Sequence, residues 1–315
     1  MSFGREAGAS AQGKNTLRRM TLAALALGAA ALFAGAAAAQ SGYIGILGGG
    51  PVYMHNDTNI RELRNAGFNE LIVWSVEVGS TGDLNLNGEF PLTANGKYIG
   101  DQTWPRFAHD LTNIKTGKVT RITFSIGSSN VGDFQHIKAL VDSQGTGRKS
   151  ILYKDFAALL AALPIDAIDL NDENSYDSES TTKFALMLGK LGLHVTINPY
   201  TNNGYWTSLV SNINSQTPGL VDGVHLQTYA GGNGNNPCVN WDFGGVPVYP
   251  GLSDQASAPP FVTPKQAKEK LAAWHTQCGI TGAWLWIFDQ IQGTDLPRKY
   301  ARAMTKGVSD TVSGK

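Results

Sequence analysis

The chain has 315 residues, with 25 Lys and Arg against 25 Asp and Glu, so its formal net charge at pH 7 is zero. A protein that coats a nucleic acid needs a clustered excess of basic residues, so this charge balance excludes that class of protein. Only 16% of the residues are charged, and seven Trp and ten Tyr are present, which excludes a disordered chain and predicts a compact globular protein.

The first 39 residues have the pattern of a secretory signal peptide. Arg18 and Arg19 precede an uncharged run at 21–39, which ends in small residues with an A-x-A site. A basic segment followed by an apolar segment and such a site is typical of a cleaved signal. The alternative is an uncleaved membrane anchor, because the run is nearly long enough to span a bilayer. Cleavage predicts a secreted or periplasmic mature protein, residues 40–315, that is not embedded in a membrane.

The mature chain contains two cysteines, Cys238 and Cys278. An even number of cysteines in an oxidising compartment predicts one disulfide bond. Two thiols that lie too far apart to bond remain the alternative at this point. Nothing in the sequence indicates an obligate partner subunit, so we expect a monomer.

Short apolar runs typical of β-strands alternate with amphipathic stretches along the mature chain. The strand-like runs lie at 43–47, 71–78, 119–125, 165–170, 194–199, 221–229, 246–250 and 282–288. Helices are predicted at 58–66, 104–114, 153–163, 178–191, 264–277 and 295–305. Eight strands alternating with helices over about 250 residues predict an α/β fold, a single (β/α)₈ barrel (a TIM barrel) in residues 40–315.

The connections between these runs support the barrel. A doubly wound sheet would have a Gly-rich phosphate loop after its first strand, but the glycines at 48–50 are followed at once by Pro51. Two long insertions, at 79–102 and 230–246, follow the second and sixth predicted strands. Both are expected at the C-terminal face of the barrel, where barrel enzymes keep their chemistry.

The fourth predicted strand carries the densest set of polar side chains. Alternate side chains of a strand share a face, so Asp169, Asn171 and Glu173 lie on one side and Ile168 and Leu170 on the other. The apolar pair is expected to pack on the helices, which points the polar set into the barrel with Glu173 nearest its mouth. Packed carboxyl groups in a dry site raise one another's pKa, which is how a Glu is kept protonated as a general acid.

Two other interpretations of this cluster are open. Asp169, Asn171 and Glu173 have the spacing that begins an EF-hand calcium loop, but Asn174 and Ser180 stand where that loop needs Gly and Glu. A purely structural carboxylate cluster at a strand end is the second alternative. No set of His, Cys and Asp has the spacing of a zinc site and no G-x-S-x-G motif is present, so neither a metal nor another cofactor is predicted.

The segment at 166–173, DAIDLNDE, resembles the DxxDxDxE signature of family 18 glycoside hydrolases, the chitinases and endo-β-N-acetylglucosaminidases. Three weaker similarities follow in the order of the family. They are Ser125-Ile-Gly127-Ser128 for its SxGG segment, Gln227-Thr-Tyr229 for its Q/M-x-Y segment, and Gly282–Trp286 for the segment whose Trp forms the floor of the sugar site. The resemblance implies a TIM barrel that acts on glycans containing N-acetylglucosamine.

The resemblance also implies a substrate-assisted retaining mechanism, an exception to the use of two enzyme carboxylates. Glu173 would protonate the glycosidic oxygen, and the sugar's own 2-acetamido oxygen would then attack the anomeric carbon to give an oxazolinium ion. Tyr229 would hydrogen-bond to the acetamide, Gln227 would bind substrate beside it, and Trp286 would stack under the reacting sugar. Asp169 would support the inner carboxylate position.

Residue 171 departs from the signature, because the family has Asp two residues before the acid and this chain has Asn171. An amide still accepts a hydrogen bond but lacks the charge that stabilises the oxazolinium, a loss of about 10²–10³ in rate for a preorganised electrostatic partner. Family 85 endo-β-N-acetylglucosaminidases, by analogy, use an Asn-x-Glu pair in this role. The runner-up function is therefore a carbohydrate-binding barrel without catalysis. A barrel with a structural acidic cluster that binds no sugar is the third.

Three further residues are weaker candidates. Glu77 stands at the mouth end of the second strand and could bind substrate, although a rim glutamate is the simpler interpretation. His225 shares a side with Gln227, and a hydrogen-bonded core histidine is its simpler interpretation. Trp241 lies in an amide-rich loop that could face a sugar, and a flexible surface loop is the alternative. A bond between Cys238 and Cys278 would hold this loop to the helix before the last strand.

Overall fold

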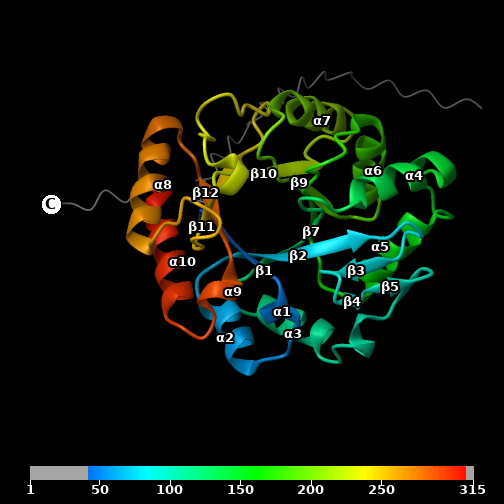
Figure 1. Ribbon diagram of the computed structural model, residues 1–315, viewed down its shortest axis with the longest axis horizontal. Helices are drawn as coiled ribbons and strands as arrows, with labels where there is room; N and C mark the ends of the chain where they lie inside the picture. Colours follow the sequence, from blue (N-terminus) through cyan, green and yellow to red (C-terminus); the bar gives the residue numbers. More distant parts are fainter. Residues whose placement is uncertain (1–41, 310–315) are drawn as a thin grey trace, which may run out of the picture. The chain divides into compact units, whose positions relative to one another are not determined.

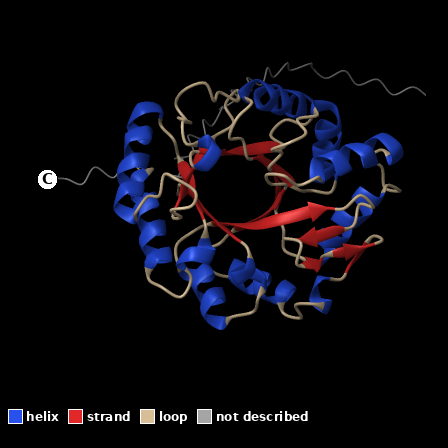
Figure 2. Cartoon of the chain, in the orientation of Figure 1, coloured by secondary structure: helices blue, strands red, loops and turns tan. Residues whose placement is uncertain are grey.

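The computed structural model describes residues 42–309, so the predicted signal peptide lies outside the described residues and stays a prediction. Eight parallel strands form a closed barrel in this part of the chain. They are β1 (Tyr43–Gly48), β2 (Glu70–Val78), β7 (Arg121–Ile126), β8 (Ala167–Leu170), β9 (His194–Ile197), β10 (Val221–Gln227), β11 (Val248–Ser253) and β12 (Gly282–Trp286). Each strand pairs with the next in this order and β12 pairs with β1, which closes the ring and confirms the predicted TIM barrel (Figures 1 and 2).

Helices surround the ring of strands, as Figure 2 shows. The longer ones are α2 (Asp57–Asn65), α3 (Phe107–Lys115), α4 (Asp133–Gln144), α5 (Ile151–Ala162), α6 (Ser178–Lys190), α7 (Asn203–Gln216), α8 (Pro264–Cys278) and α10 (Leu296–Gly307). Two single-turn helices, α1 (Gly50–Tyr53) and α9 (Phe288–Ile291), follow the first and last barrel strands. Among residues 42–309, no helix is long and apolar enough to cross a membrane.

The sequence predicted six of the longer helices and missed α4 and α7. Neither of the two has a side-chain cap: α4 begins after Gly132, and α7 begins after Asn202, which has a positive φ of 55°. The sequence of α7, NGYWTSLVSNINSQ, is also rich in Asn and Ser, which have weak helix propensity. Tertiary packing of its buried face, rather than local propensity, makes this segment helical.

The first insertion forms an antiparallel extension of the barrel. The second strand, β2, continues past the ring and pairs with β3 (Leu84–Leu86), which in turn pairs with β4 (Phe90–Pro91). A small hairpin of β5 (Thr93–Ala94) and β6 (Lys97–Tyr98) and the short 3₁₀ helix η1 (Gly100–Gln102) complete it. The second insertion contains only the 3₁₀ helix η2 (Ala230–Gly232) before the chain enters β11.

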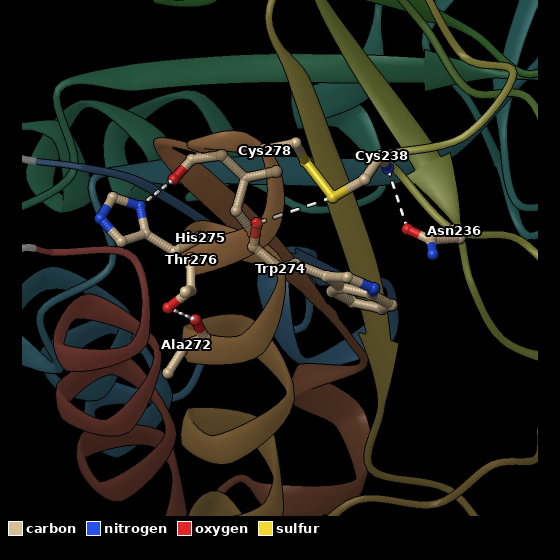
Figure 3. Close-up of a disulfide and its surroundings, with 8 residues drawn as sticks. Asn236, Cys238, Ala272, Trp274, His275, Thr276 and Cys278 are labelled. Carbon is tan, nitrogen blue, oxygen red and sulfur yellow. Dashed lines mark hydrogen bonds between the residues drawn. A yellow bond between two sulfur atoms is a disulfide. The ribbon is translucent and has the colours of Figure 1, made fainter.

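A disulfide bond holds this second insertion against helix α8. Cys238 and Cys278 are bonded, with their Cα atoms 5.5 Å apart, so the predicted pair is confirmed (Figure 3). Cys278 is the last residue of α8, and Cys238 lies in the loop that follows β10. The Cys238 Sγ atom also lies 3.6 Å from the carbonyl oxygen of Trp274, which places the loop directly against α8.

Candidate active site

The polar segment predicted from the sequence lies at the C-terminal mouth of the barrel. Asp169 belongs to β8 and is completely buried, whereas Asn171 and Glu173 follow the end of the strand. Asn171 is 5% exposed, and its Nδ2 donates to Glu173 Oε1 at 3.1 Å. The structure therefore places Asn171 and Glu173 side by side, with Asp169 one layer deeper, as the alternation of the strand predicts.

The intervening residue, Asp172, has a different task. Its buried carboxylate accepts hydrogen bonds from the backbone N–H groups of Asn174, Ser175 and Tyr176 at 3.1, 2.8 and 2.7 Å. This turn fixes the path of the chain directly after Glu173. Asp172 therefore holds the position of Glu173 and is not itself among the residues that line the cavity described below.

The surroundings of Glu173 favour its protonated form. Burial raises the pKa of its carboxyl group above the ordinary value, and hydrogen bonds from Asn171 and Gln227 only partly oppose that effect. A carboxyl group near water with a raised pKa can donate a proton and later take one back, which a general acid and base must do.

Asn171 is nearly saturated with hydrogen bonds. Besides donating to Glu173, its Nδ2 lies 3.5 Å from the carbonyl oxygen of Gly127, and its Oδ1 accepts from Gln227 Nε2 at 3.2 Å. Gly127 is required there, because its φ is 93° and a Cβ atom would lie 2.5 Å from the carbonyl oxygen of Asn171. The amide thus joins the ends of β7, β8 and β10 around Glu173.

Below this layer, Asp169 accepts four hydrogen bonds. Ser125 Oγ and Asn198 Nδ2 donate to its Oδ2 at 2.8 and 3.0 Å, while Thr196 Oγ1 and His225 Nδ1 bind its Oδ1 at 2.7 and 2.8 Å. Burial alone would raise the pKa of Asp169, but the charge of His225 and these hydrogen bonds outweigh it and lower the pKa. Asp169 is consequently an ionised group sealed inside the barrel.

The partner that keeps Asp169 ionised is His225, which is completely buried between two carboxylates. Its Nε2 lies 3.4 Å from Glu70 Oε2 and 2.6 Å from the hydroxyl of Tyr43. Burial would lower the pKa of His225, but Asp169 and Glu70 together raise it to about 9. His225 is therefore an imidazolium at neutral pH. His225 is thus a buried, hydrogen-bonded histidine, as the simpler interpretation of the sequence predicted. Its contact with Glu70 was not predicted.

A cavity of about 430 Å³ opens above these layers, within the usual range for sites of small ligands. Its lining includes four large aromatic side chains and several amides and hydroxyls. The lining residues are Leu47, Trp74, Ser128, Ser129, Asn171, Glu173, Asn198, Tyr200, Gln227, Tyr229, Ala230, Gly231, Gln255, Ser257, Ala258 and Trp286. Glu173 is the only charged one among them. Apart from this carboxyl group, the aromatic, amide and hydroxyl groups of the lining suit a neutral polar ligand.

Comparisons with known proteins identify the fold. No family model matches the sequence, and no curated protein matches it. A fungal family 18 endo-β-N-acetylglucosaminidase has a similar structure, with a TM-score of 0.61, 16% identity, and coverage of 84% of this chain and 97% of that one. The chain has the fold of family 18 glycosidases.

Two chitinases of family 18 support the same conclusion. One comes from the chitin utilization locus of Flavobacterium johnsoniae, with a TM-score of 0.57, 10% identity, and coverage of 86% of this chain and 94% of that one. The other comes from Crocus vernus, with a TM-score of 0.56, 14% identity, and coverage of 84% and 99%. At such identities the likeness shows the fold alone, so the function must be argued from the site.

On this family 18 fold, the two aromatic residues named from the sequence, Tyr229 and Trp286, lie together in the cavity lining. Tyr229 stacks on Trp286 with a centroid distance of 5.9 Å, and Trp74 meets Trp286 edge-on at 5.0 Å. Burial raises the pKa of Tyr229 well above the ordinary value, so its hydroxyl stays protonated and can donate a hydrogen bond. Trp74 and Tyr200 were not predicted, because each lies in a segment whose neighbours are typical of core or loop.

Two predicted substrate-binding residues do not reach this cavity, which corrects those expectations. Glu77 lies on the part of β2 that extends past the barrel, where it pairs with Asn85 of β3. Trp241 packs on Phe243 with a centroid distance of 6.2 Å and lines a separate hollow beside the disulfide. Within residues 42–309, no three His, Cys, Asp or Glu side chains gather in a way that could hold a metal ion.

Proposed function

We propose that this protein is an exported glycoside hydrolase that cleaves β-linked N-acetylglucosamine glycans with retention of configuration, with Glu173 as acid and base. The observation that carries the proposal is the single carboxyl group of the cavity. Glu173 lines it alone among charged residues, and its pKa is raised by burial. The names of the similar structures, an endo-β-N-acetylglucosaminidase and chitinases, support the same substrate class.

The sealed position of Asp169 favours a substrate-assisted mechanism. A retaining glycosidase ordinarily uses a second carboxylate as nucleophile, about 5–5.5 Å from the acid. Asp169 cannot take that role, because it is 0% exposed and all four of its hydrogen bonds come from the barrel interior. The nucleophile must therefore come from the substrate, and a 2-acetamido group supplies one.

The reaction then has two steps. Glu173 gives its proton to the glycosidic oxygen while the acetamido oxygen attacks the anomeric carbon, which breaks the glycosidic bond and forms an oxazolinium ion. The carboxylate of Glu173 next takes a proton from a water molecule that attacks the same carbon. The oxazolinium reopens to the acetamide, Glu173 is protonated again, and two inversions leave a β-configured product.

Replacing Trp286 with Ala is expected to weaken the binding of chitooligosaccharides by about tenfold or more, because the sugar loses its stacking surface. Trp241→Ala serves as the matched control, since Trp241 lies outside the cavity. Tryptophan fluorescence titration of both variants in the Glu173→Gln background measures binding without turnover. Equal affinities in the two variants would contradict the assignment of the cavity as the sugar site.

Replacing Asn171 with Asp is expected to raise the turnover number by about 10²-fold, because a carboxylate at this position stabilises the positive oxazolinium. The new carboxylate also faces Glu173, so the pH above which activity falls should move upward. Steady-state kinetics on a chitooligosaccharide between pH 4 and 9 measures both effects. A lower rate at every pH would show that the amide itself is the catalytic group at this position.

The second candidate is a carbohydrate-binding barrel without catalysis, and the neutral Asn171 is the observation that favours it. An assay of the protein on chitooligosaccharides and on a high-mannose glycopeptide separates the two. Turnover that depends on Glu173 supports the hydrolase. Saccharide binding that depends on Trp286, with no turnover by the wild type or by Asn171→Asp, supports the binding protein.

A further inference from the structure

A buried side chain at the cavity wall has one polar atom without a partner. Asn198 directly follows β9 and is 2% exposed. Its backbone N–H donates to the carbonyl oxygen of Leu170 at 2.9 Å, which fixes it beside the end of β8. It lines the cavity together with Asn171 and Glu173.

The orientation of the Asn198 amide is set by Asp169. Asn198 Nδ2 lies 3.0 Å from Asp169 Oδ2, and an ionised carboxylate can only accept hydrogen bonds. The amide must therefore turn its NH₂ group to Asp169 and its Oδ1 away from it. Among the described residues, Oδ1 of Asn198 has no hydrogen-bond partner although it is buried. A buried acceptor in this state calls for an explanation, because leaving it unpaired lowers stability.

The neighbouring amide, Asn171, already has a hydrogen-bond partner on each of its two polar atoms. Asn171 Oδ1 already accepts from Gln227, and Asn171 Nδ2 donates to Glu173. Of Asn171 and Asn198, Asn198 is therefore the one whose side-chain oxygen accepts no hydrogen bond from the described residues. A ligand in the cavity that presents an N–H or O–H group to the inner wall would satisfy it.

The proposed reaction indicates which donor this is. The acetamido oxygen must attack from the face of the sugar opposite to the leaving group, and Glu173 stands on the leaving-group side. In a sugar bound for this reaction, the acetamido group would lie on the face away from the proton of Glu173, and the buried Asn198 is a lining residue with an unpartnered acceptor.

We propose that Asn198 is a specificity-determining residue whose Oδ1 accepts the hydrogen bond of the substrate's 2-acetamido N–H. The proposal rests on the proposed function. It gives Asp169 a definite task, because this sealed carboxylate aims the acceptor. The N–H of the oxazolinium shares the positive charge and donates more strongly, so the same contact tightens as the reaction proceeds.

The test compares two ligands that differ at one atom, in the Glu173→Gln background that prevents hydrolysis. One is chitotriose, and the other is its analogue with a 2-O-acetyl ester, which lacks the N–H, on the sugar bound next to residue 173. With Asn198 present, we expect the N–H ligand to bind about tenfold more tightly, since the ester leaves the buried acceptor unpaired. With Asn198→Leu, which has a similar volume and no acceptor, the preference should fall below about twofold.

Two further variants keep the test decisive. Asn198→Ala replaces Asn198→Leu if the latter fails to fold, as judged by its thermal unfolding. Asn214→Leu is the matched control, because Asn214 makes two hydrogen bonds to Val221 outside the cavity, and its loss should leave the ligand preference unchanged.

The outcomes separate the two proposals. A tenfold preference that persists in the Asn198 variants overturns the role of Asn198 while glycan binding, and with it the proposed function, stands. Failure of both ligands to bind the Glu173→Gln protein overturns the proposed function and this inference together.

Discussion

Replacing Glu173 with Gln is expected to lower the turnover of a chitooligosaccharide by about 10³-fold and to leave its affinity nearly unchanged. Glutamine has the same shape, and its oxygen can still accept from Asn171 Nδ2, which lies 3.1 Å from Glu173 Oε1. It cannot give a proton to the glycosidic oxygen, so only the chemical step is lost. Steady-state kinetics together with a fluorescence titration measures the two quantities separately.

The matched control is Glu77→Gln, because Glu77 is a half-buried glutamate whose pKa burial also raises but which lies outside the cavity. Its activity should equal that of the unchanged protein. The activity of the unchanged protein should fall as the pH rises through the raised pKa of Glu173, because the acid must be protonated. Full activity of Glu173→Gln would remove this residue from the mechanism.

Replacing His225 with Gln is expected to lower the free energy of unfolding at pH 6 by about 3–5 kcal/mol, because it leaves buried Asp169 and Glu70 without their cation. For a domain of this size, the melting temperature should fall by about 10 °C. Thermal unfolding followed by circular dichroism measures the change. The exposed His109 offers the matched control, and His109→Gln should change the melting temperature little.

The titration of His225 is also expected to make the stability of the protein depend on pH. The pKa of His225 is about 9 in the folded protein, above the ordinary value of 6.5, so the folded state binds the proton more tightly. The stabilisation, on the order of 3 kcal/mol, is complete below pH 6.5 and is lost as the pH rises toward 9. His225→Gln should lack this loss between pH 7 and 9. An equal loss in the variant would contradict a charged His225.

Much of the site could be predicted because its polar residues interrupt apolar strands. Asp169, Asn171 and Glu173 stand at alternate positions of a run that must otherwise be buried, so only an inward position suits them. Tyr229 and Trp286 could be named from the resemblance of short segments at two other strand ends. The closed barrel brings these segments together, as the count of strands indicated.

The residues that the sequence did not reveal depend on contacts between distant strands. Glu70 precedes an apolar run and resembles a surface residue at the start of a strand. Only the closed barrel places it beside His225, which lies 155 residues later in the sequence. Asn198 becomes notable only because Asp169 fixes its amide and leaves one atom unpaired. No periodic pattern contains this information.

Local structure also explains why two residues predicted to bind substrate, Glu77 and Trp241, lie outside the cavity. Glu77 stands near the end of β2, as predicted, but this end of the strand pairs with β3 and does not contribute to the cavity lining. Trp241 was expected to face a sugar, but the bond between Cys238 and Cys278 holds its loop against α8.

The central claim is that the substrate's acetamido group, and not a second carboxylate, attacks the anomeric carbon. The most direct measurement compares the cleavage of a chitooligosaccharide with that of the same oligosaccharide without N-acetyl groups, because only the acetamido mechanism needs the N-acetyl group. Proton NMR of the newly formed reducing end during the first minutes of digestion shows in addition whether the configuration is retained, as both retaining mechanisms require. We predict that the β-anomer appears first and then equilibrates with the α-anomer, and that an oligosaccharide without N-acetyl groups is not cleaved. An α-anomer formed first, or cleavage of the deacetylated oligosaccharide at a similar rate, would contradict the mechanism.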